Sequence, residues 1–272
     1  MSDYDEYREP EPEERPRDTQ VDAAIMAVFK IFENEPSRVF YSTQIETILE
    51  RTYFHWITNK ALSELAAAGK VQKVSSVVVG NRVNFYSHTK NRYWRRDANK
   101  LQTLLEKIFD PDFTRAIGQH AELQCDSLLA RSGFMPERQK NINAWNGITW
   151  TRTKHNLDRI VTKDDIAYGV EIKNTQNYIP KAELEIKLDL CRDLRLVPLF
   201  IMRFAPKSYM HQINQRRGFG LLYEKQIYPL GHSQLLREVQ QELGLKVQAP
   251  FELEQGFGER LSSWHEKTKH KR

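Results

Sequence analysis

The chain has 272 residues, enough for two domains with a sizeable core. Its net charge is +5, but residues 1–20 hold eight acids and three arginines, so the remainder carries a net charge of +10. A basic surface of this kind suits an acidic partner such as nucleic acid. No apolar run is long enough to cross a membrane, which excludes an integral membrane protein on this pattern.

The first nineteen residues form an acidic leader rich in Glu and Pro, which cannot bury enough apolar surface to fold. We expect residues 1–19 to be disordered. The two cysteines, Cys125 and Cys191, lie on apolar helix faces and provide neither a disulfide framework nor zinc-ligand spacing. They favour a reducing, intracellular compartment, so we expect a cytoplasmic protein with no membrane partner.

Residues 20–96 predict three helices followed by a β-hairpin. The expected helices span 21–32, 43–50 and 55–68, with a short extended piece, 39–41, before the second. Two β-rich runs, 71–79 and 82–87, flank Gly80-Asn81, a dipeptide typical of a hairpin turn. This order of elements resembles a winged helix-turn-helix domain.

That resemblance implies that the helix 55–68 enters the major groove of DNA, where Asn pairs with adenine and Lys with guanine. Residues 41–96 hold nine Lys or Arg against three Glu, a surplus suited to phosphate contacts. The DNA-binding candidates are Thr58, Asn59, Lys60, Ser63, Arg82, Arg95 and Arg96. Winged helices also serve as protein–protein modules, and this alternative stays open.

A second hairpin is expected further along the chain. Residues 156–161 and 166–173 are predicted strands, joined by the polar loop 162–165. A four-residue loop pairs Val161 with Ile166 and Asp158 with Gly169. Because strand side chains alternate between faces, Asp158, Glu171 and Lys173 then share one face.

Two carboxylates and an ammonium on one face are suited to a particular chemistry. Hard divalent cations such as Mg²⁺ prefer carboxylate oxygens and polarise phosphoryl oxygens. A nearby lysine can orient a water or offset charge on phosphate, and Gly169 leaves room for a metal or the backbone to approach. Together these features predict hydrolysis of a phosphodiester.

The pattern Asp158…Glu171-x-Lys173 resembles the PD-(D/E)XK nuclease superfamily, which includes type II restriction endonucleases and Holliday-junction resolvases. The resemblance covers about residues 100–230 and implies an αβββαβ core. It implies Asp158 and Glu171 as metal ligands, Lys173 as the catalytic lysine and Glu122 as an auxiliary ligand. The chain departs from the family's pattern at Leu157, where proline often stands.

The remaining elements alternate between helix and strand. Helices are expected over 180–195, 208–217 and 234–243, and strands over 197–202 and 221–228. Lys187 would join the Asp158 face only if Leu184 and Leu188 point into the sheet. We therefore expect an α/β fold: a restriction-endonuclease-like mixed sheet flanked by helices, preceded by a small winged-helix domain. The expected boundaries are 20–96, 97–260 and a basic tail, 261–272.

The leading hypothesis is a Mg²⁺-dependent endodeoxyribonuclease, with Mn²⁺ as a substitute metal and duplex DNA as partner. A homodimer would suit double-strand cutting, because one site hydrolyses one strand at a time. Two alternatives remain: a non-catalytic DNA-binding regulator on a nuclease-like scaffold, and a nuclease for RNA or branched DNA.

Overall fold

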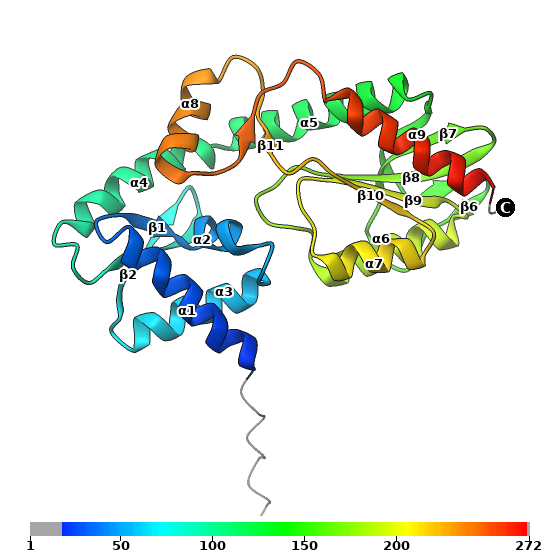
Figure 1. Cartoon of the computed structure of the whole chain (residues 1–272). Coiled ribbons are helices and arrows are strands. Elements are labelled where there is room, and N and C mark those ends of the chain that lie inside the picture. The colour runs from blue at the N-terminus through cyan, green and yellow to red at the C-terminus, as the bar shows by residue number, and fades with distance from the viewer. Residues whose placement is uncertain (1–17, 271–272) are drawn as a thin grey trace, which may run out of the picture.

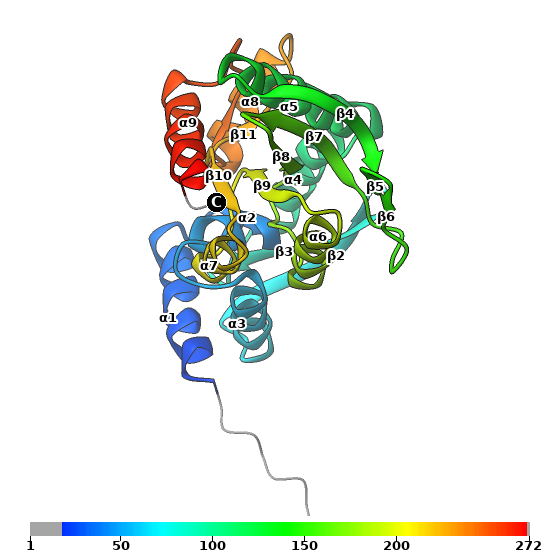
Figure 2. The same ribbon diagram turned by 90° about the vertical axis from the view of Figure 1, so that its right-hand side faces the viewer.

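The structure is a computed structural model that describes residues 18–270 (Figure 1). The predicted acidic leader lies outside the described residues except for its last two positions. A smaller N-terminal unit and a larger unit built around a central sheet lie side by side in the two views (Figures 1 and 2). Among the helices of residues 18–270, none combines the length and apolar character needed to cross a bilayer.

The N-terminal unit contains the helices and the hairpin expected from the sequence. Its elements are α1 (Thr19–Asn34), β1 (Val39–Tyr41), α2 (Ser42–Leu49), α3 (His55–Ala67), β2 (Val71–Val78) and β3 (Asn81–His88). The three strands form an antiparallel sheet in the order β1-β3-β2. The apolar face predicted for α3, including Ile57, Leu62 and Leu65, is buried against α1.

The turn between β2 and β3 lies one residue earlier than predicted. Val78 pairs with Asn81, so Val79 and Gly80 form the two-residue turn with φ of 47° and 76°. Such a turn needs positive φ at both central residues, which glycine adopts freely and valine does not. The side-chain amide of Asn81 donates to the carbonyl of Val79 and supports this conformation.

The predicted boundary at residue 96 falls inside a helix, α4 (Trp94–Ile108), which the sequence analysis did not anticipate. α4 packs on β1 and β2, and its Leu101 and Leu105 join one apolar cluster with Phe85 of the hairpin. The same cluster includes Phe113 and Val239 from the larger unit. The two units therefore share a core and are not separated by a linker.

The larger unit is a mixed α/β layer structure. Its elements are α5 (Pro111–Arg131), β4 (Met135–Ile142), β5 (Ala144–Trp145), β6 (Ile148–Thr149), β7 (Leu157–Lys163), β8 (Ile166–Lys173), α6 (Lys181–Asp193), β9 (Val197–Met202), α7 (Lys207–Gln215), β10 (Phe219–Leu222), β11 (Gln226–Ile227), α8 (Ser233–Glu238), a π-helical segment (Val239–Leu243), β12 (Val247–Gln248) and α9 (Gln255–Lys269). The main sheet has the order β10-β9-β8-β7-β4. β4, β7 and β8 are antiparallel, whereas β8, β9 and β10 are parallel. The expected mixed sheet flanked by helices is confirmed.

Helices cover both faces of this sheet (Figures 1 and 2). α5 and α9 lie on one face, where Cys125, Leu129 and Leu261 pack against Tyr168 and Val170 of β8. α6 and α7 lie on the other face, where their apolar residues pack against β7 and β9. Both cysteines are free and buried in these helices, as the sequence predicted.

The register of the β7–β8 hairpin differs from the prediction by two residues. Lys163 pairs with Ile166 across a tight turn formed by Asp164 and Asp165, whose φ values are 47° and 61°. The four-residue loop, with Val161 opposite Ile166 and Asp158 opposite Gly169, is therefore wrong. Arg159 pairs with Val170, and the same register puts Asp158 opposite Glu171. A shift of two preserves the face of every side chain, so the predicted clustering survives the error.

Gly169 has a packing role in place of the predicted open approach for a metal. A Cβ at this position would lie 2.8 Å from both Sγ of Cys191 and Cδ1 of Leu157. The absent side chain lets α6 and the start of β7 pack closely on β8.

Two further predictions are corrected at the end of the chain. The single strand 221–228 is divided between β10 and β11, because Glu224 turns the backbone with φ of 65°. The basic tail 261–272 is mostly helix: residues 261–269 belong to α9, and Leu261 and His265 are fully buried. Amphipathic spacing of these buried residues was the signal available in the sequence.

Candidate active site

Asp158, near the start of β7, lies close enough to Glu171 of β8 for its charge to raise the pKa of that residue. Oδ2 of Asp158 accepts a hydrogen bond of 2.8 Å from the backbone N–H of Ile172, which ties the start of β7 to β8. Glu171 is buried, with 4% of its surface exposed. Lys173, two residues further along β8, points to the same face because of the strand period. The structure thus brings the three predicted residues together.

Lys187 is the closest partner of Glu171. Its Nζ lies 2.7 Å from Oε2 of Glu171 and also donates to the carbonyl of Asn156. Leu184 and Leu188 are both buried against the sheet. This was the condition under which the sequence placed Lys187 on the Asp158 face, and it is met. α6 consequently delivers a buried ammonium directly to the predicted ligand carboxylate.

Lys173 has a partner that the sequence analysis missed. Its Nζ lies 3.0 Å from Oε1 of Glu183, in the first turn of α6, and both side chains are partly exposed. Glu183 precedes Lys187 by four residues, so the two project from the same side of the helix. This i,i+4 spacing was a signal in the sequence, but only the docking of α6 brings it to β8.

Glu122 approaches from α5, on the opposite face of the sheet. Its Oε2 lies 2.8 Å from Nη2 of Arg159, whose Nε lies 2.9 Å from Oδ1 of Asp126. Arg159 is almost fully buried and holds both acids of α5. The predicted auxiliary ligand is therefore engaged in an ion pair, and Asp126 and Arg159 are additional charged residues that the sequence analysis did not select.

Burial and the charges of neighbouring acids raise the pKa values of Asp158 and Glu171, with Glu122 as the acid that acts on Asp158. Burial, followed by the charge of Asp158, raises the pKa of Glu171 to about 7, although Lys187 and Lys173 act in the opposite direction. Burial also raises the pKa of Asp158, and the N–H of Ile172 and the charge of Lys187 oppose this rise. Two nearby carboxylates that are hard to ionise together favour an additional proton or cation between them.

The donor atoms of this cluster fit a hard divalent cation. Asp158 and Glu171 offer carboxylate oxygens, which Mg²⁺ prefers, and one or two carboxylates are a normal protein contribution to such a site. Their raised pKa values arise first from burial, which leaves the two carboxylates in need of further positive charge when both are ionised. A bound cation would supply that charge.

A different set of potential ligands lies at the turn of the β7–β8 hairpin. Within residues 18–270, the group of three ligand atoms that all lie within 4.8 Å of one another comes from Asp164, His265 and Glu266. Asp164 is already paired with Nζ of Lys269 at 2.9 Å, and His265 contacts the hydroxyl of Tyr168. A cation at this turn would compete with Lys269 for Asp164, just as a cation at Glu171 would compete with Lys187.

The predicted DNA-binding residues of α3 differ in accessibility. Thr58 is fully buried, so its hydroxyl does not reach a base edge, and this assignment is corrected. Asn59 is exposed but donates to Oε1 of Glu46 at 2.8 Å, and Ser63 donates to the carbonyl of Asn59. Lys60 is exposed on the outer face of the helix.

The remaining predicted DNA-binding residues, Arg82, Arg95 and Arg96, are all exposed. Arg82 lies near the start of β3, beside the hairpin turn. The guanidinium of Arg95 lies 5.5 Å from the ring centre of Trp94, and that of Arg96 lies 5.2 Å from the ring centre of Tyr93. Arg82 and Arg95 are therefore free to meet solvent or a ligand, whereas Nε of Arg96 lies 3.5 Å from Oδ1 of Asp97.

The N-terminus of α3 faces the larger unit. A cleft of about 750 Å³ separates them, with Glu46, His55 and Trp56 on one side and Tyr178 and Lys181 on the other. The hydroxyl of Tyr178 accepts a hydrogen bond from the backbone N–H of His55, and the two rings lie 4.4 Å apart. These contacts join residues far apart in the chain, and nothing in their local spacing predicts them.

No family model, no curated protein and no solved structure matches the chain. Its function is therefore inferred from its own residues and their arrangement.

Proposed function

We propose that this protein is a metal-dependent endodeoxyribonuclease whose active site is formed by Asp158, Glu171 and Lys173. The observation that carries the proposal is the buried carboxylate of Glu171, whose pKa is raised by burial and by the charge of the nearby, half-buried Asp158, with a lysine two residues from Glu171. A structural role gives no reason to hold like charges together in a buried position.

Asp158 and Glu171 would hold a divalent cation, which when bound supplies Lewis-acid polarisation of a phosphoryl oxygen. Lys173 would bind a phosphate oxygen or orient the attacking water, exchanging its contact with Glu183 for one with the substrate. Lys187 holds the Glu171 carboxylate in position, because its Nζ donates to both that carboxylate and the carbonyl of Asn156. Glu122, whose charge raises the pKa of Asp158, would serve as an auxiliary ligand by exchanging its contact with Arg159 for one with the cation.

The order of elements supports the resemblance to PD-(D/E)XK nucleases. α5, β4, β7, β8, α6 and β9 follow one another in the αβββαβ order that the resemblance implies, with the short β5–β6 pair inserted after β4. Asp158 and Glu171 come from adjacent strands, β7 and β8, as the resemblance implies.

The N-terminal unit supports a role in binding duplex DNA. Its order of helix, strand, helix, helix and hairpin supports the resemblance to a winged helix-turn-helix. Lys60, Arg82, Arg95 and Arg96 are exposed there and would contact phosphates or base edges. A second copy of the chain would supply the second cut of a double-strand break.

The test is incubation of supercoiled plasmid with the purified protein and Mg²⁺, Mn²⁺ or EDTA. We expect metal-dependent nicking or linearisation that is lost in Asp158→Asn, Glu171→Gln and Lys173→Met. Glu266→Gln removes a carboxylate from the other group of potential ligands and should cut normally. Cleavage that survives Asp158→Asn and Glu171→Gln would overturn the proposal, and loss only in Glu266→Gln would move the metal to the hairpin turn.

One observation favours the second candidate, a DNA-binding protein that does not cut. Each cation of the site already has a carboxylate partner: Lys187 with Glu171, Lys173 with Glu183, and Arg159 with Glu122. Such a closed set of pairs suits a scaffold. A gel shift on duplex DNA without metal-dependent cutting of duplex, branched DNA or RNA would establish this alternative.

A further inference from the structure

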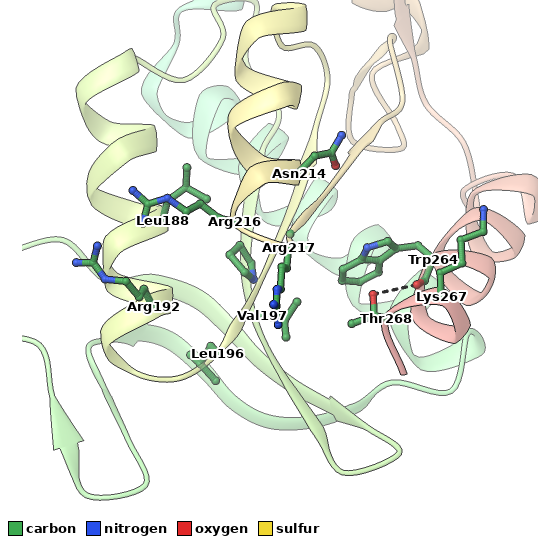
Figure 3. A pocket seen from close by; sticks show the side chains of 12 residues that line it. Leu188, Arg192, Leu196, Val197, Asn214, Arg216, Arg217, Trp264, Lys267 and Thr268 are labelled. Carbon is green, nitrogen blue, oxygen red and sulfur yellow. Dashed lines mark hydrogen bonds between the residues drawn. The ribbon is translucent and has the colours of Figure 1, made fainter. Parts of the chain in front are cut away.

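A second charged feature lies away from the candidate active site, where α6 and α7 end. A pocket of about 470 Å³ opens there, between the C-terminal ends of these helices and α9 (Figure 3). Its apolar lining comes from Leu188, Leu196, Val197 and Pro198. Its charged lining consists of Arg192, Arg216, Arg217 and Lys267, without any acidic side chain.

A neighbouring groove of about 510 Å³ extends this basic surface along α9. The groove shares Asn214, Trp264 and Lys267 with the pocket and adds Arg260 and Glu259. The two hollows together are therefore lined by five cations and one acid. A concave surface with this excess of positive charge concentrates field lines and attracts polyanions.

Two of the pocket's cations are not neutralised by the protein. Arg192 pairs with Asp189 at 2.9 Å and Asp193 at 3.1 Å, and Arg216 pairs with Asp189 at 3.3 Å. Within residues 18–270, the charged groups of Arg217 and Lys267 have neither an ion pair nor a hydrogen bond. Figure 3 shows them on different sides of the pocket, Arg217 beyond α7 and Lys267 on α9.

The backbone at Arg217 provides an independent observation. Its φ is +58°, in the left-handed region that follows many helices and that usually holds glycine or asparagine. A side chain other than glycine is strained in this conformation. Arg195, which follows α6, has the same φ of +58°. Such strain is found at ligand-binding sites, but Arg195 does not line the pocket, so the unpaired charges of the lining are the stronger indication of a ligand.

We propose that this pocket binds phosphate groups of a nucleic-acid backbone, with Arg217 and Lys267 as the principal contacts. The inference rests on the proposed nucleic-acid function and extends it to a second surface. α6 connects the two surfaces: Glu183 contacts Lys173, and Arg192, nine residues later, lines the pocket. At 1.5 Å per residue these positions are about 14 Å apart along the helix, or roughly four base pairs of duplex.

The test measures binding without cleavage. Fluorescence anisotropy in EDTA would follow a labelled 20-base-pair duplex, and separately its single strand, at several salt concentrations. The variant is Arg217→Gln with Lys267→Gln. The matched control is Arg237→Gln with Lys246→Gln, which removes one exposed arginine and one exposed lysine at and after α8.

We expect the pocket variant to raise Kd about tenfold and to reduce the salt slope by about two, one for each lost phosphate contact. The control variant should bind as the unchanged protein does. Unchanged Kd in the pocket variant would overturn the proposal, as would an equal loss in the control.

Thermal unfolding distinguishes phosphate binding from a role of these cations in the stability of the fold. Cations near helix C-termini also interact with the helix dipole. A lower Tm with unchanged Kd in the pocket variant would assign Arg217 to that role and overturn the proposal. The assay contains no metal, so an absence of cutting by the protein leaves its outcome unaffected, and a preference for single strand or duplex identifies the form of nucleic acid bound.

Discussion

Glu171 and Lys187 form a buried ion pair, with 2.7 Å between Oε2 and Nζ and only 5% and 6% of the two side chains exposed. The pair joins the C-terminal half of β8 to the middle of α6. Removing one partner of a buried pair leaves the other charge without compensation, which is costly. The pair is therefore central both to the stability of the layer and to the charge of the candidate site.

Lys187→Met should lower the free energy of unfolding by about 3–5 kcal/mol near pH 8. The folded pKa of Glu171, about 7, lies above its ordinary value of 4.5, so its contribution to stability is greatest below pH 4.5 and declines as pH rises through 7. Without Lys187 this decline becomes steeper, so the loss should be smaller at pH 5 than at pH 8. Urea unfolding at both pH values checks this, with exposed Lys181→Met as control; equal losses would contradict it.

A divalent cation should stabilise the protein more at pH 8 than at pH 6. Glu171 must lose its proton to bind a cation, and its pKa of about 7 places that transition between the two pH values. We expect the rise in Tm with Mg²⁺ or Mn²⁺ to grow across this range and to disappear in Glu171→Gln. A rise that is independent of pH, or retained in the variant, would place the cation elsewhere.

Glu50 and Arg203 connect the two units and should contribute strongly to their docking. The guanidinium of Arg203 holds both carboxylate oxygens of Glu50, at 2.7 and 2.6 Å, and its Nε donates to the carbonyl of Thr175. The backbone N–H of Arg203 donates to the carbonyl of Lys173. Glu50→Gln should therefore destabilise the protein at neutral pH by about 3–5 kcal/mol.

The pH dependence of this variant has a defined sign. Burial alone would raise the pKa of Glu50, but the hydrogen bonds and charges of Arg203 and His55 outweigh it and lower the pKa. A lowered pKa gives stability that is present above the ordinary value and lost as pH falls through the folded value. The difference between Glu50→Gln and the unchanged protein should thus shrink in acid, and exposed Glu35→Gln is the control. A constant difference would assign the loss to altered packing.

Gly169→Ala should destabilise the protein by about 1–3 kcal/mol, because the new Cβ would overlap Cys191 and Leu157. Differential scanning calorimetry would measure the loss. Gly169→Ala with Cys191→Ala removes one of the two obstructing atoms and should recover part of the stability lost through the clash. A fully stable Gly169→Ala that binds no metal would instead support the approach role that the sequence suggested.

Local patterns were sufficient for much of the architecture. The period of two in residues 166–173 predicted β8 with its correct bounds, and the apolar run 197–202 predicted β9 with its own. The face shared by Asp158, Glu171 and Lys173 also followed from that period, and it tolerated an error of two residues in the register. The tight turn requires positive φ at Asp164 and Asp165, and the sequence signals this only weakly. A longer polar loop fits the same residues, which explains the error in the register.

The partners of the site could not be read in this way. The docking of α5 and α6 on the sheet decides the ion-pair partners of the site. It brings Lys187 to Glu171 and Glu183 to Lys173, and it pairs Arg159 with Glu122. Contacts between segments distant in the chain decide three further features. These are the burial of Thr58, the ion pair between Glu50 and Arg203, and the pocket around Arg217. Alternation and helical spacing act over a few neighbouring residues, so the sequence specifies faces, whereas burial and charge pairing arise from the simultaneous packing of whole elements.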